Sequence, residues 1–316
     1  MIPAVLMGYA LGAARYNHLP PLQPSELWAP LPVQHTEVEG VDIAYIDSGL
    51  PPGADPDAPP LVFVHGLSSY MSFWEYQIPE FAKTHRVLAL DLPGFGASAR
   101  PDAPYTPPWY ADVVDNWLGS MGVVSAVVIG HSMGGQIAMT LALNHPSRVH
   151  ALVLSAPAGL ERFQPGAASW MKDYWTESRA MEAREEEIRA NFQAMVFNRM
   201  DRGVERLIEE RVRVMKTEAF AGTSVAVSRC IAGMVDYPVW DRLGEIRVPT
   251  LIVYGSDDHM IPNPVFTGGS TRSIAEAGKR AIRGAELELI PGGGHTVHHD
   301  RPEKFNAAVS DFLGRL

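Results

Sequence analysis

A serine stands at the centre of the pattern Gly130-His131-Ser132-Met133-Gly134. An apolar run, residues 126–129, precedes it, and a stretch that favours a helix follows it. In this context G-x-S-x-G is typical of a sharp strand-to-helix turn that holds the serine hydroxyl clear of the backbone. The N-terminus of the helix favours negative charge that develops beside it. The pattern therefore predicts that Ser132 is a nucleophile.

A serine hydroxyl attacks poorly until a base removes its proton. The predicted base is His295, which follows three glycines after the apolar stretch 286–290. His298 and His299 are close alternatives, but they stand directly before the expected C-terminal helix, residues 301–316. Their simplest role is at the entry to that helix.

The base needs a carboxylate that holds its tautomer and stabilises its charged form. Asp257 and Asp258 follow the apolar stretch 251–254, and the order Ser, Asp, His along the chain fits a nucleophile of this kind. We predict Asp258, with Asp257 as a turn residue. Glu161 is a further alternative.

An acyl-transfer site also needs two backbone N–H groups for the oxyanion, each contributing about 3 kcal/mol in the transition state. The residue after the nucleophile, Met133, supplies one by position. The predicted second donor is Leu67, in the loop after the apolar stretch 61–64. No side chain identifies either donor.

These residues need a scaffold, and short apolar runs alternate with helical stretches along the chain. The expected strands are residues 41–46, 61–64, 86–90, 125–129, 151–154, 251–254 and 286–290, and helices are expected at 109–121 and 136–144. Continuous apolar runs are typical of strands that are covered on both faces. The sequence predicts an α/β fold: a mostly parallel sheet with helices on both faces.

Residues 161–240 break this alternation, because they contain no convincing strand. Helices are expected here, for example at 170–197 and 204–215, and six of the thirteen methionines fall in the segment. We predict a helical lid. Most of its apolar side chains should pack the lid itself, and a minority should line a substrate pocket, since methionine adapts to irregular ligands. The predicted pocket residues are Trp170, Met171, Trp175, Met195 and Met234.

The first 32 residues form a separate part, so the predicted organisation is 1–32, then a core of 33–160 and 241–316, interrupted by the lid 161–240. Residues 1–14 are apolar at helical spacing. We expect a short helix that packs on the body, on a second chain or on a lipid surface, followed by a proline-rich arm at 20–32. The run is too short to span a membrane, and its first positive charge, Arg15, comes after it, unlike a secretory signal. A cytoplasmic location is expected.

The composition of the chain limits the classes of partner and cofactor that it can bind. The chain has 316 residues and a net charge of −10, which argues against nucleic acid as a partner and would repel acidic substrates on approach. Its one cysteine, Cys230, excludes an intrachain disulfide. His145, His150 and His259 lack metal-ligand spacing, and no dinucleotide fingerprint is present, so no metal or cofactor is expected.

Several motifs stand in the order found in one family. They are His65-Gly66, residues 91–98 (DLPGFGAS), Gly130 to Gly135, Gly255 to Pro262, and Gly294-His295 with Asp300-Arg301-Pro302. On these residues the chain resembles the α/β-hydrolase fold family, in its lidded esterase and lipase branch, from about residue 33 to the end. Branches of that family with an aspartate nucleophile are excluded, because position 132 is serine.

The resemblance implies a serine hydrolase of carboxylic esters with apolar acyl or aryl groups, acting through an acyl-enzyme. Other enzymes of the same fold with a serine triad remain open, namely a carbon–carbon hydrolase, a thioesterase or a perhydrolase. A non-catalytic receptor for a small ligand also remains open.

Overall fold

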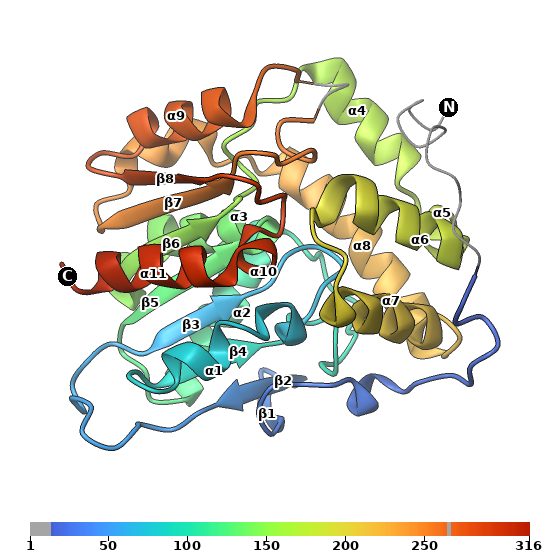
Figure 1. Cartoon of the computed structure of the whole chain (residues 1–316), viewed down its shortest axis with the longest axis horizontal. Helices are drawn as coiled ribbons and strands as arrows, with labels where there is room; N and C mark the ends of the chain where they lie inside the picture. The colour runs from blue at the N-terminus through green and yellow to red at the C-terminus, as the bar shows by residue number, and fades with distance from the viewer. Residues whose placement is uncertain (1–13, 264–266) are drawn as a thin grey trace.

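The computed structural model describes residues 14–263 and 267–316, which form an α/β core and a helical insertion beside it (Figure 1). The strands are β1 (Gln34–Val38), β2 (Val41–Asp47), β3 (Leu61–Val64), β4 (Val87–Leu90), β5 (Ala126–His131), β6 (Val149–Ser155), β7 (Thr250–Gly255) and β8 (Glu286–Ile290). They form one sheet in the order β1-β2-β4-β3-β5-β6-β7-β8. The pairings of β1 with β2 and of β2 with β4 are antiparallel, and all other pairings are parallel. The predicted fold class is confirmed.

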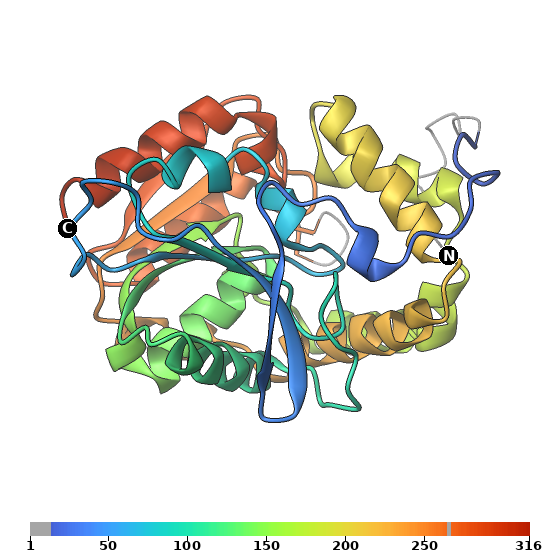
Figure 2. The same ribbon diagram turned by 90° about the horizontal axis from the view of Figure 1, so that it is seen from below.

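Alternate residues of each buried strand serve two separate cores. In β3, Val62 and Val64 pack on one face of the sheet, while Leu61 and Phe63 pack on the other. The first face is covered by α2 (Pro107–Ser120), α3 (Met133–Asn144) and α9 (Thr271–Ala281); the second by α1 (Ile78–Phe81), α10 (Val297–Asp300) and α11 (Pro302–Leu313). Figure 2 shows α11 and α1 on one side of the sheet and α2 on the other. This two-sided burial explains why the strands have continuous apolar sequences.

Strand β1 was not predicted from the sequence. Its residues, QHTEV, are mostly polar, and only Val38 is buried. It is an edge strand held by antiparallel pairing with β2, in the register of Gln34 opposite Tyr45. Because one edge and one face meet solvent, hydrophobic patterning gives no signal for it.

The helical insertion lies between β6 and β7. It contains α4 (Pro165–Tyr174), α5 (Glu177–Met181), α6 (Glu185–Asn191), a π-helical turn (Phe192–Val196), α7 (Arg202–Val214) and α8 (Ala219–Asp236). The expected helix at 170–197 is therefore several short ones: α4 ends at Tyr174, and Thr176 caps α5 by accepting from the Arg179 N–H. The expected helix at 204–215 agrees with α7.

An N-terminal arm, residues 14–33, crosses the insertion and joins it to β1 (Figure 2). The buried Glu185 carboxylate of α6 accepts from the backbone N–H groups of Arg15, Tyr16 and Asn17 at 2.6–3.0 Å. Lys216, which lies just after the C-terminal end of α7, also holds the arm by donating to the carbonyl groups of Tyr16, Asn17 and Leu19.

The helix expected at residues 1–14 falls, except for its last residue, outside the described residues. Within the described residues, no helix is long and apolar enough to cross a membrane.

The arm should depend on Glu185. Replacing it with alanine leaves three backbone donors without their charged acceptor, so Glu185→Ala should lower the free energy of unfolding by about 1–3 kcal/mol. It should also speed trypsin cleavage after Arg15. Urea unfolding and timed proteolysis measure these effects, with Glu186→Ala as the neighbouring control. If Glu185→Ala resists trypsin as well as the parent chain does, these bonds do not hold the arm.

Candidate active site

Ser132 lies at the strand-to-helix turn between β5 and α3, with φ 52° and ψ −118°. A non-glycine residue in such a conformation costs about 1–3 kcal/mol and persists only where its surroundings hold it. Here the Ser132 N–H donates to the Ser155 carbonyl of β6, and the Ser132 carbonyl accepts from Gly135 and Gln136.

Two glycines permit the close packing around this turn. A Cβ on Gly134 would lie 2.3 Å from the Val64 carbonyl oxygen, which leaves no room for a side chain. A Cβ on Gly66, in the loop after β3, would lie 2.9 Å from His131 Nδ1 and 3.2 Å from Ser132 Cβ. The loop after β3 therefore rests directly against the serine.

Three predicted residues meet in one hydrogen-bonded chain. His295 Nε2 lies 3.0 Å from Ser132 Oγ, and His295 Nδ1 lies 3.0 Å from Asp258 Oδ2. A carboxylate only accepts, so Nδ1 carries the proton and Nε2 is free to accept from the serine hydroxyl. The second Asp258 oxygen accepts from the N–H groups of Met260 and Ile261 at 2.8 and 2.9 Å. Both side chains are buried, which keeps water from competing for these bonds.

The alternative residues lie elsewhere. Asp257 is exposed and accepts from its neighbour Ser256, and Glu161 accepts from the Asn263 N–H at 2.6 Å. His298 Nδ1 lies 3.1 Å from Ser155 Oγ, and His299 Nε2 lies 2.8 Å from Glu75 Oε1. The structure thus brings Asp258 and His295 to Ser132.

The two predicted oxyanion donors flank the serine. Met133 is the first residue of α3, where an N–H has no acceptor within its own helix. Leu67 follows Gly66, which touches the turn. Within the described part of the chain, neither N–H donates to a protein acceptor. Both remain candidate donors for an oxyanion.

Two further histidines, His131 and His298, lie beneath the base. His131 Nε2 donates to the His295 carbonyl oxygen at 3.1 Å, and the His298 ring stacks on Trp74 with centroids 4.1 Å apart. Burial lowers the pKa of His131 and of His298 well below 6.5. These rings are uncharged at neutral pH and form a packed floor under His295.

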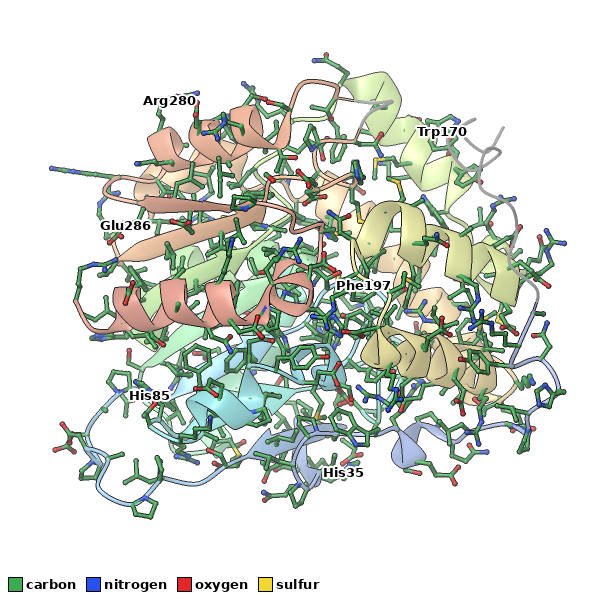
Figure 3. The ribbon with its side chains drawn as sticks, viewed as in Figure 1. His35, His85, Trp170, Phe197, Arg280 and Glu286 are labelled. Atoms are coloured by element: carbon green, nitrogen blue, oxygen red, sulfur yellow. The ribbon has the colours of Figure 1, made fainter. Side chains whose placement is uncertain are left out.

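Asp300 ties the loop of the base to the insertion. Its carboxylate accepts from the Gly294 N–H at 2.7 Å and from the N–H groups of Asn198 and Arg199, and burial raises its pKa. Thr296 donates to the Val196 carbonyl through both its N–H and its hydroxyl. Phe197, buried between these contacts, lies where the insertion meets the core (Figure 3). The motif Asp300-Arg301-Pro302 signalled this position, but not its bonds.

A cavity of about 140 Å³ lies between the core loops and the insertion. Of the predicted pocket residues, Trp175 lines it, and Trp170, Met171, Met195 and Met234 do not. Trp170 stacks on Tyr174 at the outer edge of α4 (Figure 3), whereas Met195 and Met234 pack within hydrophobic clusters. The cavity is instead walled by residues of α5 to α8, by Leu27 of the arm, and by Ser68, Tyr70 and Phe95 of the core.

Neither a metal nor a reactive thiol stands out in the part of the chain that the structure describes. It contains no group of three His, Cys, Asp or Glu side chains that could hold a metal ion. Cys230 is buried, and burial raises its thiol pKa to about 12.

A model of the alpha/beta hydrolase family matches residues 61–308, which is most of the chain and includes all three residues of the hydrogen-bonded chain. The protein belongs to the alpha/beta hydrolase family. The sequence-based resemblance is confirmed.

Relatives within the alpha/beta hydrolases differ in reaction. A 1-acylglycerol-3-phosphate O-acyltransferase of Arabidopsis thaliana is 25% identical to this chain over 80% of its length. The match spans 66% of the length of that relative. A 2-hydroxymuconate semialdehyde hydrolase of a Pseudomonas species is 28% identical over 80% of this chain and 86% of its own. The crystal structure of "a probable hydrolytic enzyme" from Pseudomonas aeruginosa has a TM-score of 0.82 and 25% identity, covering 93% of this chain and 98% of its own. Family membership therefore leaves the bond that is cleaved undecided.

The orienting carboxylate should be Asp258. In Asp258→Asn the amide can donate to Nδ1 and so favour the wrong tautomer of His295, and turnover should fall by about 10³–10⁴-fold. Asp257→Asn, which changes an exposed carboxylate, should stay within about threefold. Steady-state hydrolysis of a p-nitrophenyl ester measures both. A reversed pair of effects, or a comparable loss in Glu161→Gln, would reject Asp258.

The lowered pKa of His298 predicts a pH-dependent stability. The unfolded chain protonates this histidine below about 6.5, whereas the folded chain does so only at a much lower pH, so its contribution to stability is lost as pH falls. His298→Gln lacks the titrating ring, so its free energy of unfolding does not fall with pH for this reason. The difference in free energy of unfolding between the parent chain and His298→Gln, measured at pH 7, should therefore shrink by about 1 kcal/mol for each pH unit below 6.5. Urea unfolding at pH 7, 6 and 5 measures it.

The exposed His150→Gln serves as the control, and its difference from the parent chain should not change with pH. A His298→Gln difference that is equally constant between pH 7 and 5 would contradict the burial argument.

Proposed function

We propose that the protein is a serine esterase that cleaves carboxylic esters through an acyl-enzyme. The observation that carries the proposal is the continuous chain of hydrogen bonds from Ser132 Oγ through His295 to Asp258. An unprotonated Nε2 beside a serine hydroxyl is what general-base activation requires.

In the proposed reaction, Ser132 Oγ attacks the acyl carbonyl while His295 Nε2 takes the hydroxyl proton. Asp258 stabilises the imidazolium that forms and keeps its ring oriented. The N–H groups of Met133 and Leu67 hold the oxyanion of the tetrahedral intermediate. His295 then protonates the leaving alcohol. A water that gives its proton to the same nitrogen attacks the acyl-enzyme, releases the acid and restores Ser132.

The cavity that reaches Ser68, next to the proposed donor Leu67, supports an apolar substrate portion. Phe95, Ile188, Val214 and Phe220 are among its lining residues. Each substrate methylene that leaves water there contributes about 0.8 kcal/mol. We expect kcat/KM to rise several-fold from acetate to butyrate or hexanoate esters, and to fall once the cavity is full.

Ser132→Ala should lower ester hydrolysis by about 10⁴-fold or more without changing the fold. A fluorophosphonate probe should label Ser132 in the parent chain. Hydrolysis of p-nitrophenyl esters, mass spectrometry of the labelled peptide and circular dichroism measure these effects. Ser68→Ala and Ser98→Ala serve as controls; the Ser98 hydroxyl is buried and donates to the Asp91 carbonyl.

Labelling at Ser68 or Ser98 would overturn the assignment. A panel of ester, thioester and dienone substrates tests the bond that is cleaved. Absence of turnover on every substrate, with Ser132 unlabelled, would favour a ligand receptor over an enzyme.

A further inference from the structure

Three arginines interrupt the apolar wall of the 140 Å³ cavity. They are Arg100 from the loop after β4, Arg179 from α5 and Arg211 from α7. Within the described residues, none of their guanidinium groups forms an ion pair. Charged groups removed from water are normally paired, because an unpaired one is costly.

Two of these arginines are held in place by neutral partners. Arg100 donates to the carbonyl groups of Ser98 and Gly96 at 2.6 and 2.8 Å, and to Thr223 Oγ1 at 3.1 Å. Arg179 donates to the Tyr174 hydroxyl at 2.6 Å. Each of the two also has a carboxylate within electrostatic range. The charge of Arg100 opposes the burial that raises the pKa of Asp91, and the charge of Arg179 contributes to the lowered pKa of Glu187.

Arg211 has less. Its guanidinium lies 6.0 Å from the centre of the Phe192 ring, and in the described part of the chain no carboxylate or carbonyl accepts from it. Other arginines of α7 differ: Arg206 pairs with Glu75 at 2.7 Å, and Arg213 pairs with Glu209 at 2.9 Å. Arg211 therefore faces the cavity with unused donors.

The cavity's one lining carboxylate, among the described residues, does not supply the missing charge. Glu210 accepts from the Tyr70 hydroxyl and from the Trp28 N–H, and Arg206 lies 4.0 Å from it. Its oxygens are engaged by these partners, so Arg211 stays without an ion pair among the described residues.

The cavity also reaches the loop that would bind the oxyanion. Ser68 lines it and directly follows Leu67, and Gly66 of the same loop packs against Ser132. A ligand in the cavity thus contacts the residue that follows a proposed oxyanion donor, although Ser132, Asp258 and His295 do not line the cavity themselves.

We propose that the cavity binds a substrate whose end remote from the scissile ester carries an anion, a carboxylate or a phosphate, and that Arg211 is its principal partner. The inference rests on the proposed esterase function and specifies its substrate. A guanidinium binds either anion through two parallel N–H···O bonds. The chain's net charge of −10 predicts repulsion at a distance, but three cations in a low-dielectric wall attract an anion at close range.

A matched set of substrates tests the proposal on the unaltered chain. p-Nitrophenyl hexanoate is compared with the mono-p-nitrophenyl ester of adipic acid, which has the same chain length with a terminal carboxylate. A third ester carries a terminal phosphate, and the better of the two anionic esters identifies the anion. The better one should exceed the neutral ester by about tenfold or more in kcat/KM, chiefly through KM. Its advantage should shrink as salt rises from 0.02 to 0.5 M.

Variants locate the effect. Arg211→Met should lower the ratio of anionic to neutral kcat/KM by about tenfold, and Arg211→Lys should restore part of it, since lysine keeps the charge but not the fork. Arg202→Met, at an exposed position of the same helix, should leave the ratio unchanged. A neutral ester that outperforms both anionic esters, or an equal loss on all three esters in Arg211→Met, would overturn the proposal.

Failure of the esterase function is distinguishable from failure of this inference. The shift of the melting temperature by hexanoate, compared with the shift by uncharged 1-hexanol of the same chain length, measures anion binding without turnover. A larger shift by hexanoate that Arg211→Met abolishes would support the site even in a chain that cleaves no ester. Equal shifts by the two ligands would count against it whether or not esters are cleaved.

Discussion

The geometry of the site depends on one backbone conformation, that of Ser132. Its φ of 52° is unfavourable for a residue with a side chain, and the surrounding sheet holds it there. Gly130 of β5 lies in register with Val64 of β3 and Leu154 of β6, so the turn begins where three parallel strands end together. Hydrogen bonding to Ser155 and the close approach of Gly134 to Val64 leave the turn no alternative position. The packed core thus sustains the strain that presents the hydroxyl.

The position of the base has a different origin. His295 stands on a loop, and loops seldom hold a side chain precisely without support. Three supports converge here: Asp258 on one ring nitrogen, His131 on the backbone carbonyl, and Asp300 on the preceding residue, Gly294. Because Asp300 also accepts from Asn198 and Arg199, the loop of the base and the insertion are bonded to the same carboxylate. A displacement of the insertion at this point would strain the loop that carries the base.

Charge in this molecule has to be considered locally. The whole chain is acidic, and most of its arginines are paired with carboxylates on the surface or across helices. The cavity departs from that pattern, because its arginines come from three separate elements and none of them forms an ion pair among the described residues; Arg100 and Arg179 have carboxylates only at longer range. A net charge describes the approach of a ligand over distances beyond the Debye length, about 8 Å at physiological salt, and not its contacts once bound. An acidic chain can therefore hold a basic cavity.

Local chemistry made much of this protein predictable from its sequence. The turn around Ser132 needs only neighbouring residues, and runs buried on both faces are apolar by necessity, so the parallel strands and the family resemblance were accessible. The polar edge strand β1 was not, because pairing with β2 rather than burial defines it. The sequence nominated Asp258 over Asp257 and His295 over His298, and only the tertiary structure brought the chosen pair within 3.0 Å contacts.

The cavity belongs wholly to the tertiary structure. Of the five pocket residues predicted from composition, one lines it, since an apolar residue on a short helix can face a cavity, a core or solvent equally well. Arg211 stands in a helix rich in alternating charges and looks in the sequence like part of a solvated face. Whether such a charge finds a partner depends on which helices fold against it, and for Arg211 that packing provides a largely apolar cavity and, among the described residues, no ion pair.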